Sequence, residues 1–234
     1  MSLATVERSP RFYARLAGVI YLSAMGLSIV SQMFILGRLV QDDPRATANN
    51  ILASEGLFRL GIAIDLCIAV SDVVIAWAFY ELLRAVDRSL ALVGALLRVV
   101  DGSILAITTL IALLTLRLLS GVSYLLSFDQ AQLQSLARLS VSARGLGSYV
   151  AFVFLGLGSA IFAYLLLKSA FVPKLLAGWG VFASLLLAIG SLLVIVSPTF
   201  AASASMIYMV PMFFYEVPLG LWFLIKGVAA AEKR

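Results

Sequence analysis

The chain has 234 residues, of which 62% are hydrophobic and 12% charged, and its mean hydropathy is +1.07. A soluble domain is about one quarter charged, and a core built from a chain of this length cannot hide so much apolar surface, so a soluble protein is excluded. The net charge of +5 comes from bases at the ends of apolar runs rather than from a basic stripe interleaved with aromatic residues, so we expect contact with membrane lipid and no nucleic-acid binding.

The sequence contains no histidine and one cysteine, Cys67. It therefore lacks the usual axial ligand of haem, the commonest zinc ligand and the usual proton shuttle, and it cannot form an internal disulfide or a cysteine cluster for iron–sulfur. We expect no cofactor and no metal site. Cys67 is interpreted as a packing residue within a helix.

Six apolar stretches have about the 20 residues that a helix needs to cross a hydrocarbon core of about 30 Å. In chain order they are residues 16–36, 57–83, 90–116, 145–167, 175–196 and 205–225. The first is too long for the apolar region of a secretory signal, and no cleavage site follows it. The expected fold class is therefore all-α, a polytopic membrane bundle of six transmembrane helices that forms one domain over residues 1–234.

Two connections on the outer side have helical signals. Asp43 can cap a helix that has Pro44 in its first turn. The segment from Ser127 to Gln130 has the spacing of a capping box and precedes residues with a mixed apolar face. We expect a short interfacial helix within each of the segments 42–52 and 127–141.

Lysine and arginine residues are unequally divided between the two sides of this arrangement. Leaving out Arg59 and Arg98 as intramembrane, five lie on one side, namely Arg38, Arg45, Arg117, Arg138 and Arg144. Ten lie on the other side, namely Arg8, Arg11, Arg15, Arg84, Arg88, Lys168, Lys174, Lys226, Lys233 and Arg234. The positive-inside rule places the side with ten, and with it both termini, in the cytoplasm.

Four ionisable residues interrupt the apolar stretches, namely Asp72, Arg98, Asp101 and Glu216. At a rise of about 1.5 Å per residue they lie about 12–16 Å from the cytoplasmic ends of their helices. That depth is near the midplane of a core about 30 Å thick. A charge in hydrocarbon is costly, so we expect these side chains to face the bundle interior and form a ligand- or ion-binding site.

The second and third stretches form a hairpin, so their helices should pack side by side. Arg98 and Asp101 are three residues apart on one helix face, and we predict that Arg98 contacts Asp72, Asp101 or both. Asp65 shares a face with Asp72, seven residues away. Asp65 and Arg59 lie nearer the outer end, where we expect them to act as supporting polar residues.

Glu216 lies between Pro211 and Pro218. Each proline removes a backbone donor and clashes with the preceding turn, so we expect the sixth helix to kink or loosen beside this carboxyl group. Irregular backbone at membrane depth is tolerated only where protein buries it or water reaches it.

Two interpretations of the polar centre stay open. It could be a structural knot that fixes helix register, or it could serve cation- or proton-linked transport. Three acids face one base, which favours transport, because either carboxyl groups stay protonated or a cation completes the balance. The alternative function is a structural or accessory subunit that packs against a membrane partner or a second copy. A membrane enzyme is less well supported, because no nucleophile–base pair is recognisable, and we assign no catalytic residue.

Several short motifs occur in order along the chain. They are RLAGVIYL at 15–22, ATANNI at 46–51, LFRLG at 57–61, AFYELLR at 78–84, LAL at 90–92 before Leu97 and Arg98, and YEVPL at 215–219 with Leu221 and Trp222. Together they resemble the bacterial membrane proteins grouped as domain of unknown function 4386, over roughly residues 11–227. The family pattern near Glu216 usually reads closer to Glu-Leu-Ser-Leu, so Pro218 departs from it. The resemblance implies a bacterial inner-membrane location and supplies no activity or substrate.

Overall fold

A computed structural model describes residues 9–125, 127–169, 171–203 and 205–228. These residues form helices, short connections and no strand. The elements are α1 (Pro10–Ile29), the π-helical segment η1 (Val30–Leu36), α2 (Gly37–Leu39), α3 (Pro44–Ala53), α4 (Glu55–Leu83), α5 (Arg88–Leu119), the 3₁₀ turn η2 (Ser123–Leu125), α6 (Gln130–Ser169), α7 (Lys174–Val196), α8 (Pro198–Ser203), the 3₁₀ turn η3 (Ser205–Met209) and α9 (Val210–Ile225).

Six helical segments in the described part are long and apolar enough to cross a membrane. They are Pro10–Leu39, Glu55–Leu83, Arg88–Leu119, Gln130–Ser169, Lys174–Val196 and Ile207–Ile225. Each contains all or nearly all of one of the six predicted apolar stretches, although the fourth begins 15 residues earlier than predicted. The protein is therefore an all-α bundle with the character of a multi-pass membrane protein.

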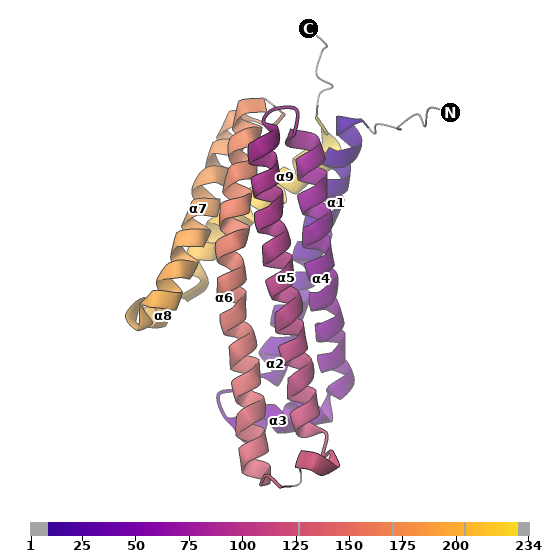
Figure 1. Ribbon diagram of the computed structural model, residues 1–234, viewed down its shortest axis with the longest axis vertical. Coiled ribbons are helices and arrows are strands. Elements are labelled where there is room, and N and C mark those ends of the chain that lie inside the picture. Colours follow the sequence, from indigo (N-terminus) through magenta and orange to yellow (C-terminus); the bar gives the residue numbers. More distant parts are fainter. Residues whose placement is uncertain (1–8, 126, 170, 204, 229–234) are drawn as a thin grey trace, which may run out of the picture.

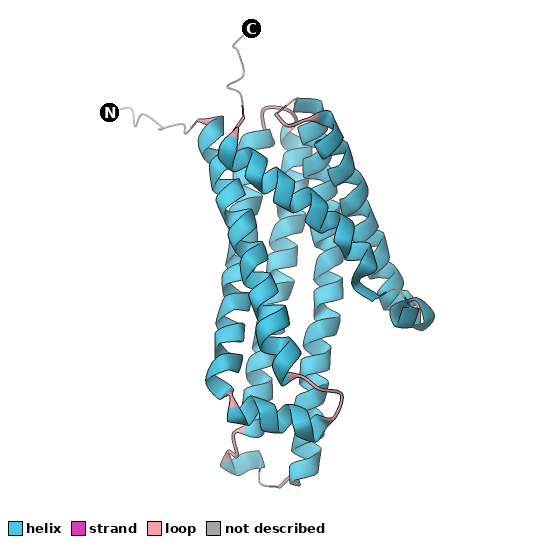
Figure 2. Cartoon of the chain, turned by 180° about the vertical axis from the view of Figure 1, so that it is seen from behind, coloured by secondary structure: helices cyan, strands magenta, loops and turns pink. Residues whose placement is uncertain are grey.

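The long helices α4, α5 and α6 run side by side along the molecule, with α1 packed on α4 and α7 packed on α6 (Figure 1). The α9 helix crosses α1 obliquely (Figure 2). The two helices meet closely at a pair of glycines, since a Cβ atom at Gly18 would lie 2.8 Å from the carbonyl oxygen of Gly220. The two ends of the described chain are adjacent, because Arg11 Nε donates a hydrogen bond of 3.3 Å to the Val228 carbonyl.

The first of the two short helices expected in the connections is confirmed as α3, which lies across the end of the bundle away from the termini (Figure 1). The Asp43 carboxylate accepts hydrogen bonds from the backbone N–H groups of Arg45 and Ala46, and Pro44 is in the first turn. Ile51 on the inner face of α3 is fully buried. The Asp43 cap and the buried apolar face together stabilise this short helix, as expected.

The prediction of a second, separate helix before the fourth span is wrong. A capping box does form, but between Asp129 and Gln132, two residues further along the chain than predicted. The helix that starts there continues to Ser169, and at a rise of about 1.5 Å per residue it is about 60 Å long. Its first turns bury Ala137 and Val141 against the bundle rather than against lipid. Tertiary packing on this face carries the helix through Gly145, where the sequence suggested a new start.

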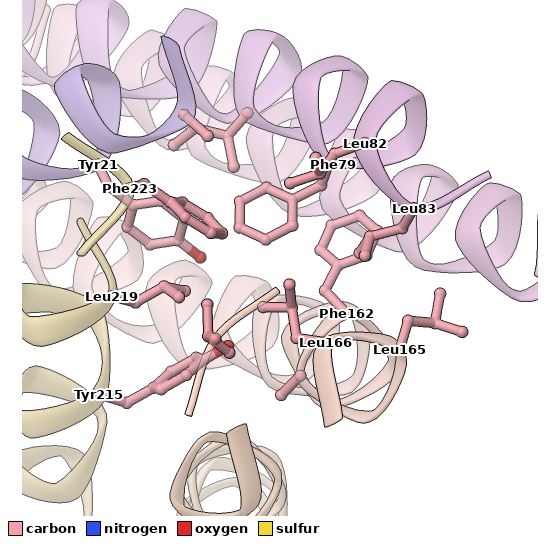
Figure 3. Close-up of a cluster of buried hydrophobic side chains, with 14 of the residues drawn as sticks. Tyr21, Phe79, Leu82, Leu83, Phe162, Leu165, Leu166, Tyr215, Leu219 and Phe223 are labelled. Atoms are coloured by element: carbon pink, nitrogen blue, oxygen red, sulfur yellow. The ribbon is translucent and has the colours of Figure 1, made fainter. Parts of the chain in front are cut away.

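A cluster of aromatic rings joins four helices in the half of the bundle near the termini (Figure 3). Phe79 of α4 stacks on Phe162 of α6, with ring centroids 4.8 Å apart. It also contacts Tyr21 of α1 and Phe223 of α9, each at 5.8 Å. This apolar layer fixes the positions of the helices that carry the polar side chains described next.

Candidate functional site

The ion pair predicted between the second and third membrane helices is present. Arg98 Nη2 on α5 donates to Asp72 Oδ1 on α4, and both side chains are buried. Arg98 Nη1 lies 3.7 Å from Asp101 Oδ2, one turn further along α5. Arg98 therefore reaches both aspartates. We call Asp72, Arg98, Asp101 and the nearby Glu216 the inner cluster.

Glycines on two helices make room for Arg98 and its partners. A Cβ atom at Gly102 of α5 would lie 2.9 Å from the Ala69 carbonyl oxygen, so this glycine lets α4 and α5 approach beside Asp72. A Cβ atom at Gly158 of α6 would lie 3.0 Å from Arg98 Cγ. The arginine is held between three helices that come closer than larger residues would allow.

Arg98 and Asp101 do not use all of their hydrogen-bonding capacity among the described residues. Arg98 Nε and Nη1 and both carboxyl oxygens of Asp101 are buried without a hydrogen-bond partner there. Only 1% of Asp101 is exposed. Leaving a buried polar group unpaired is costly, so Asp101 is stable in this place only if its charge or its hydrogen-bonding needs are met in another way.

Glu216 lies beside this ion pair without joining it. Within the described residues it makes no ion pair, although it is close enough to Arg98 and Asp72 for their charges to act on it. Tyr21 of α1 lies close to the same groups, and its ring centroid is 6.0 Å from Arg98 Cζ. The structure thus brings three of the four predicted residues into contact and leaves the fourth as a neighbouring carboxyl group.

The two prolines around Glu216 act differently from each other. Pro211 lies in the first turn of α9, where a helix needs no backbone donor, so the break expected there is instead the start of the helix. Pro218 lies inside α9, which remains helical on both sides of it. Because proline lacks an N–H group, the carbonyl of Phe214 loses its helical donor within one turn of Glu216.

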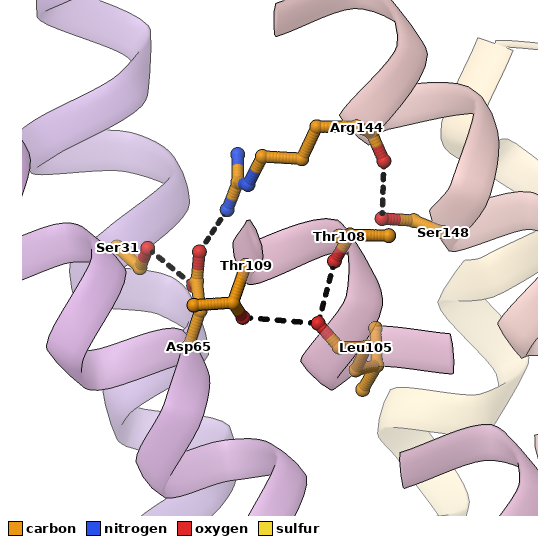
Figure 4. Close-up of polar contacts among 7 residues, drawn as sticks. All are labelled: Ser31, Asp65, Leu105, Thr108, Thr109, Arg144 and Ser148. Carbon is orange, nitrogen blue, oxygen red and sulfur yellow. Dashed lines mark hydrogen bonds and ion pairs between the residues drawn. The ribbon is translucent and has the colours of Figure 1, made fainter. Parts of the chain in front are cut away.

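A second ion pair, whose side chains are mostly but not fully buried, joins α6 to α4 nearer the Glu55 end of α4 (Figure 4). Arg144 Nη2 on α6 donates to Asp65 Oδ2 on α4, and Ser31 Oγ in η1 donates to Asp65 Oδ1 at 2.9 Å. We call Ser31, Asp65 and Arg144 the outer cluster. The hydroxyl groups of Thr108 and Thr109 beside it bond to the carbonyl of Leu105 on their own helix.

Sequence reasoning missed the role of Arg144. With the fourth span starting at Gly145, this arginine was expected outside the membrane on the outer surface. The spacing of Ala137, Val141 and Arg144, four and then three residues apart, places them on one helix face and could have identified it. Arg59 was expected to support the polar centre, but it is exposed and pairs with Glu55 at 2.7 Å, one turn away on α4.

The chemistry available in this interior is that of carboxylates, arginines and hydroxyl groups. In the described part of the chain, no three acidic or cysteine side chains gather closely enough to hold a metal ion. Single carboxyl groups such as that of Glu216 can accept and release a proton.

The family described as Domain of unknown function (DUF4386) matches the chain over residues 16–227. No curated protein and no solved structure matches this chain. The match covers both charged clusters and, apart from residues 10–15, the six helices long enough to cross a membrane.

Proposed function

The chain belongs to the DUF4386 family, and we propose that it carries protons across the membrane through its interior, with Glu216 as the residue that takes up and releases the proton. The observation that carries this proposal is the carboxyl group of Glu216, which is partly buried in a membrane bundle and has no ion-pair partner among the described residues. Carboxyl groups in the interior of membrane proteins commonly mark proton or ion pathways.

The balance of charge in the inner cluster supports a proton as the transported ion. Arg98 is engaged by Asp72 and faces Asp101, so its single positive charge is already shared between two acids. If all four groups were ionised, the cluster would hold two uncompensated negative charges in a medium that solvates charge poorly. Protonating Glu216 or Asp101 removes that excess, and reversing the protonation releases a proton.

A proton also suits the geometry better than a metal cation does. Calcium and magnesium take six or more oxygen ligands at short distances. The acids of the inner cluster are distributed over α4, α5 and α9, and Asp72 is already bound to Arg98. A single carboxyl group is sufficient for a proton.

We place the protein in a bacterial inner membrane, with the end that carries both termini in the cytoplasm. The described basic residues at this end are Arg11, Arg15, Arg84, Arg88, Lys168, Lys174 and Lys226. Arg8, Lys233 and Arg234, which were also assigned to this side, lie outside the described residues. An excess of lysine and arginine marks the cytoplasmic side of short-looped membrane proteins.

Proton flux into proteoliposomes, driven by a potassium diffusion potential and followed with an internal pH dye, tests this function. We expect flux above that of protein-free liposomes for the wild type and background flux for Glu216→Gln. Glu55→Gln is the matched control, because it neutralises an exposed glutamate on α4 and should leave flux unchanged. Wild-type flux equal to that of empty liposomes, or equal flux in Glu216→Gln and wild type, would refute the proposal.

A structural or accessory subunit is the second candidate, and the two interhelical ion pairs on α4 favour it. Asp72 and Asp65 bind this helix to α5 and α6, as a scaffold requires. In that function the protein packs against a membrane partner or a second copy. Substituting Asp72 would then lower stability, while Glu216→Gln would have no effect on proton flux.

A further inference from the structure

A cavity of about 260 Å³ lies at the end of the bundle opposite the termini. It is open on one side and is bordered by α3, the last turn of α5, the turn η2 and the start of α6. Leu119, Leu125, Phe128 and Leu133 are among its apolar walls, and Gln130 and Gln134 contribute carboxamide groups. Four separate elements border the cavity, and it is remote from both charged clusters.

The lining specifies the kind of molecule that fits. None of the described residues that line the cavity is charged, so an ionised ligand would lose hydration without gaining a partner among them. Gln130 and Gln134 are four residues apart on one face of α6, and neither has a hydrogen-bond partner among the described residues. The walls therefore suit an apolar chain, while the two carboxamides suit an uncharged hydroxyl or carbonyl group.

The position of the cavity gives it access to such a molecule. Leu113 and Leu114 of α5 are exposed apolar residues, and Arg117 one turn later is exposed and charged. The hydrocarbon layer therefore ends close to the turn of α5 that borders the cavity.

We propose that this cavity binds an uncharged amphiphilic lipid from the membrane surface opposite the termini. Its chain lies among the leucines and Phe128, and its polar head accepts or donates hydrogen bonds at Gln130 and Gln134. The proposal stands on the cavity alone and does not depend on the proton pathway.

Photolabelling in nanodiscs tests the proposal, with a dodecanol analogue that carries a mid-chain diazirine as the probe. We expect adducts on peptides that contain residues 118–134, and we expect excess dodecanol to suppress them. Leu133→Trp should reduce labelling by at least about tenfold, because the indole fills the space the chain needs. Gln134→Leu should weaken competition by dodecanol about fivefold, the effect of one lost hydrogen bond.

Leu136→Trp is the matched control, because Leu136 lies on the same helix but is exposed and does not line the cavity. Its labelling should equal that of the wild type. Adducts spread over lipid-facing residues such as Leu110 and Leu139 without saturation would overturn the proposal. Competition by dodecanoate equal to that by dodecanol would overturn the assignment to an uncharged head. If Leu133→Trp fails to fold, Gln134→Leu decides the question through the same competition.

Discussion

Asp65 and Asp72 lie seven residues apart on one face of α4, and each forms an ion pair with an arginine from a different helix. At a rise of about 1.5 Å per residue the two carboxylates are about 10 Å apart along the helix axis. The α4 helix is thus bound to α5 at one level and to α6 and η1 at another. The Asp72–Arg98 pair is buried and the Asp65–Arg144 pair is mostly buried. Removing one partner of a buried ion pair costs more than the intact pair contributes.

The pair of Asp72 and Arg98 should dominate the stability of the inner cluster. We expect Asp72→Asn and Arg98→Ala each to destabilise the protein by about 3–5 kcal/mol, because each leaves one buried charge without its partner. The double variant should lose clearly less than the sum of the single losses. Thermal unfolding of all four proteins in the same detergent measures this coupling, and strictly additive losses would show that the two side chains do not interact.

The pair of Asp65 and Arg144 should behave in the same way, although Arg144 was expected outside the membrane. We expect Arg144→Gln to destabilise the protein by about 3 kcal/mol, and adding Asp65→Asn should restore part of the loss. Arg59→Gln is the matched control, since its exposed pair with Glu55 is worth only about 0.3–0.5 kcal/mol. Equal thermal stability of Arg144→Gln and Arg59→Gln would place Arg144 in water and contradict the buried pair.

The membrane bundle and the inner ion pair were predictable for definite physical reasons. Apolar stretches long enough to span hydrocarbon have few alternatives to a transmembrane helix. The short turn between α4 and α5 makes them neighbours, so Arg98 could reach Asp72. The outer pair was not predictable in the same way, because it joins α4 to α6 across residues far apart in the sequence. Finding it required knowing that α6 starts at Gln130 and not at Gly145.

The position of Glu216 could be predicted in depth but not in contact. Hydropathy and helix rise place this residue near the middle of its span. Whether it meets Arg98 depends on the angle at which α9 crosses α1, and that angle is set by the close approach of Gly18 and Gly220. Periodicity along one helix contains no information on such a crossing.

Gly158 provides a test of how tightly Arg98 is held. A Cβ atom there would lie 3.0 Å from both Arg98 Cγ and the Gly94 carbonyl oxygen, so Gly158→Ala should cost about 1–3 kcal/mol through overpacking. Gly145→Ala on the same helix meets no atom within 4 Å and should stabilise the protein by about 0.5–1 kcal/mol. Opposite shifts in the unfolding temperature are expected, and a shift of the same sign in both variants would contradict this packing.

Gly180 of α7 links helix packing to the proposed proton carrier. A Cβ atom at this position would overlap the ring of Tyr215, the residue next to Glu216 on α9. We expect Gly180→Ala to displace this part of α9 and to reduce proton flux, because the Glu216 carboxyl group shifts relative to Arg98. Gly178→Ala is the control, since it lies on the same helix and meets nothing within 4 Å. Proteoliposome flux, compared at equal amounts of folded protein, separates the two variants, and unchanged flux in Gly180→Ala would show that proton transfer does not depend on how α9 packs against α7.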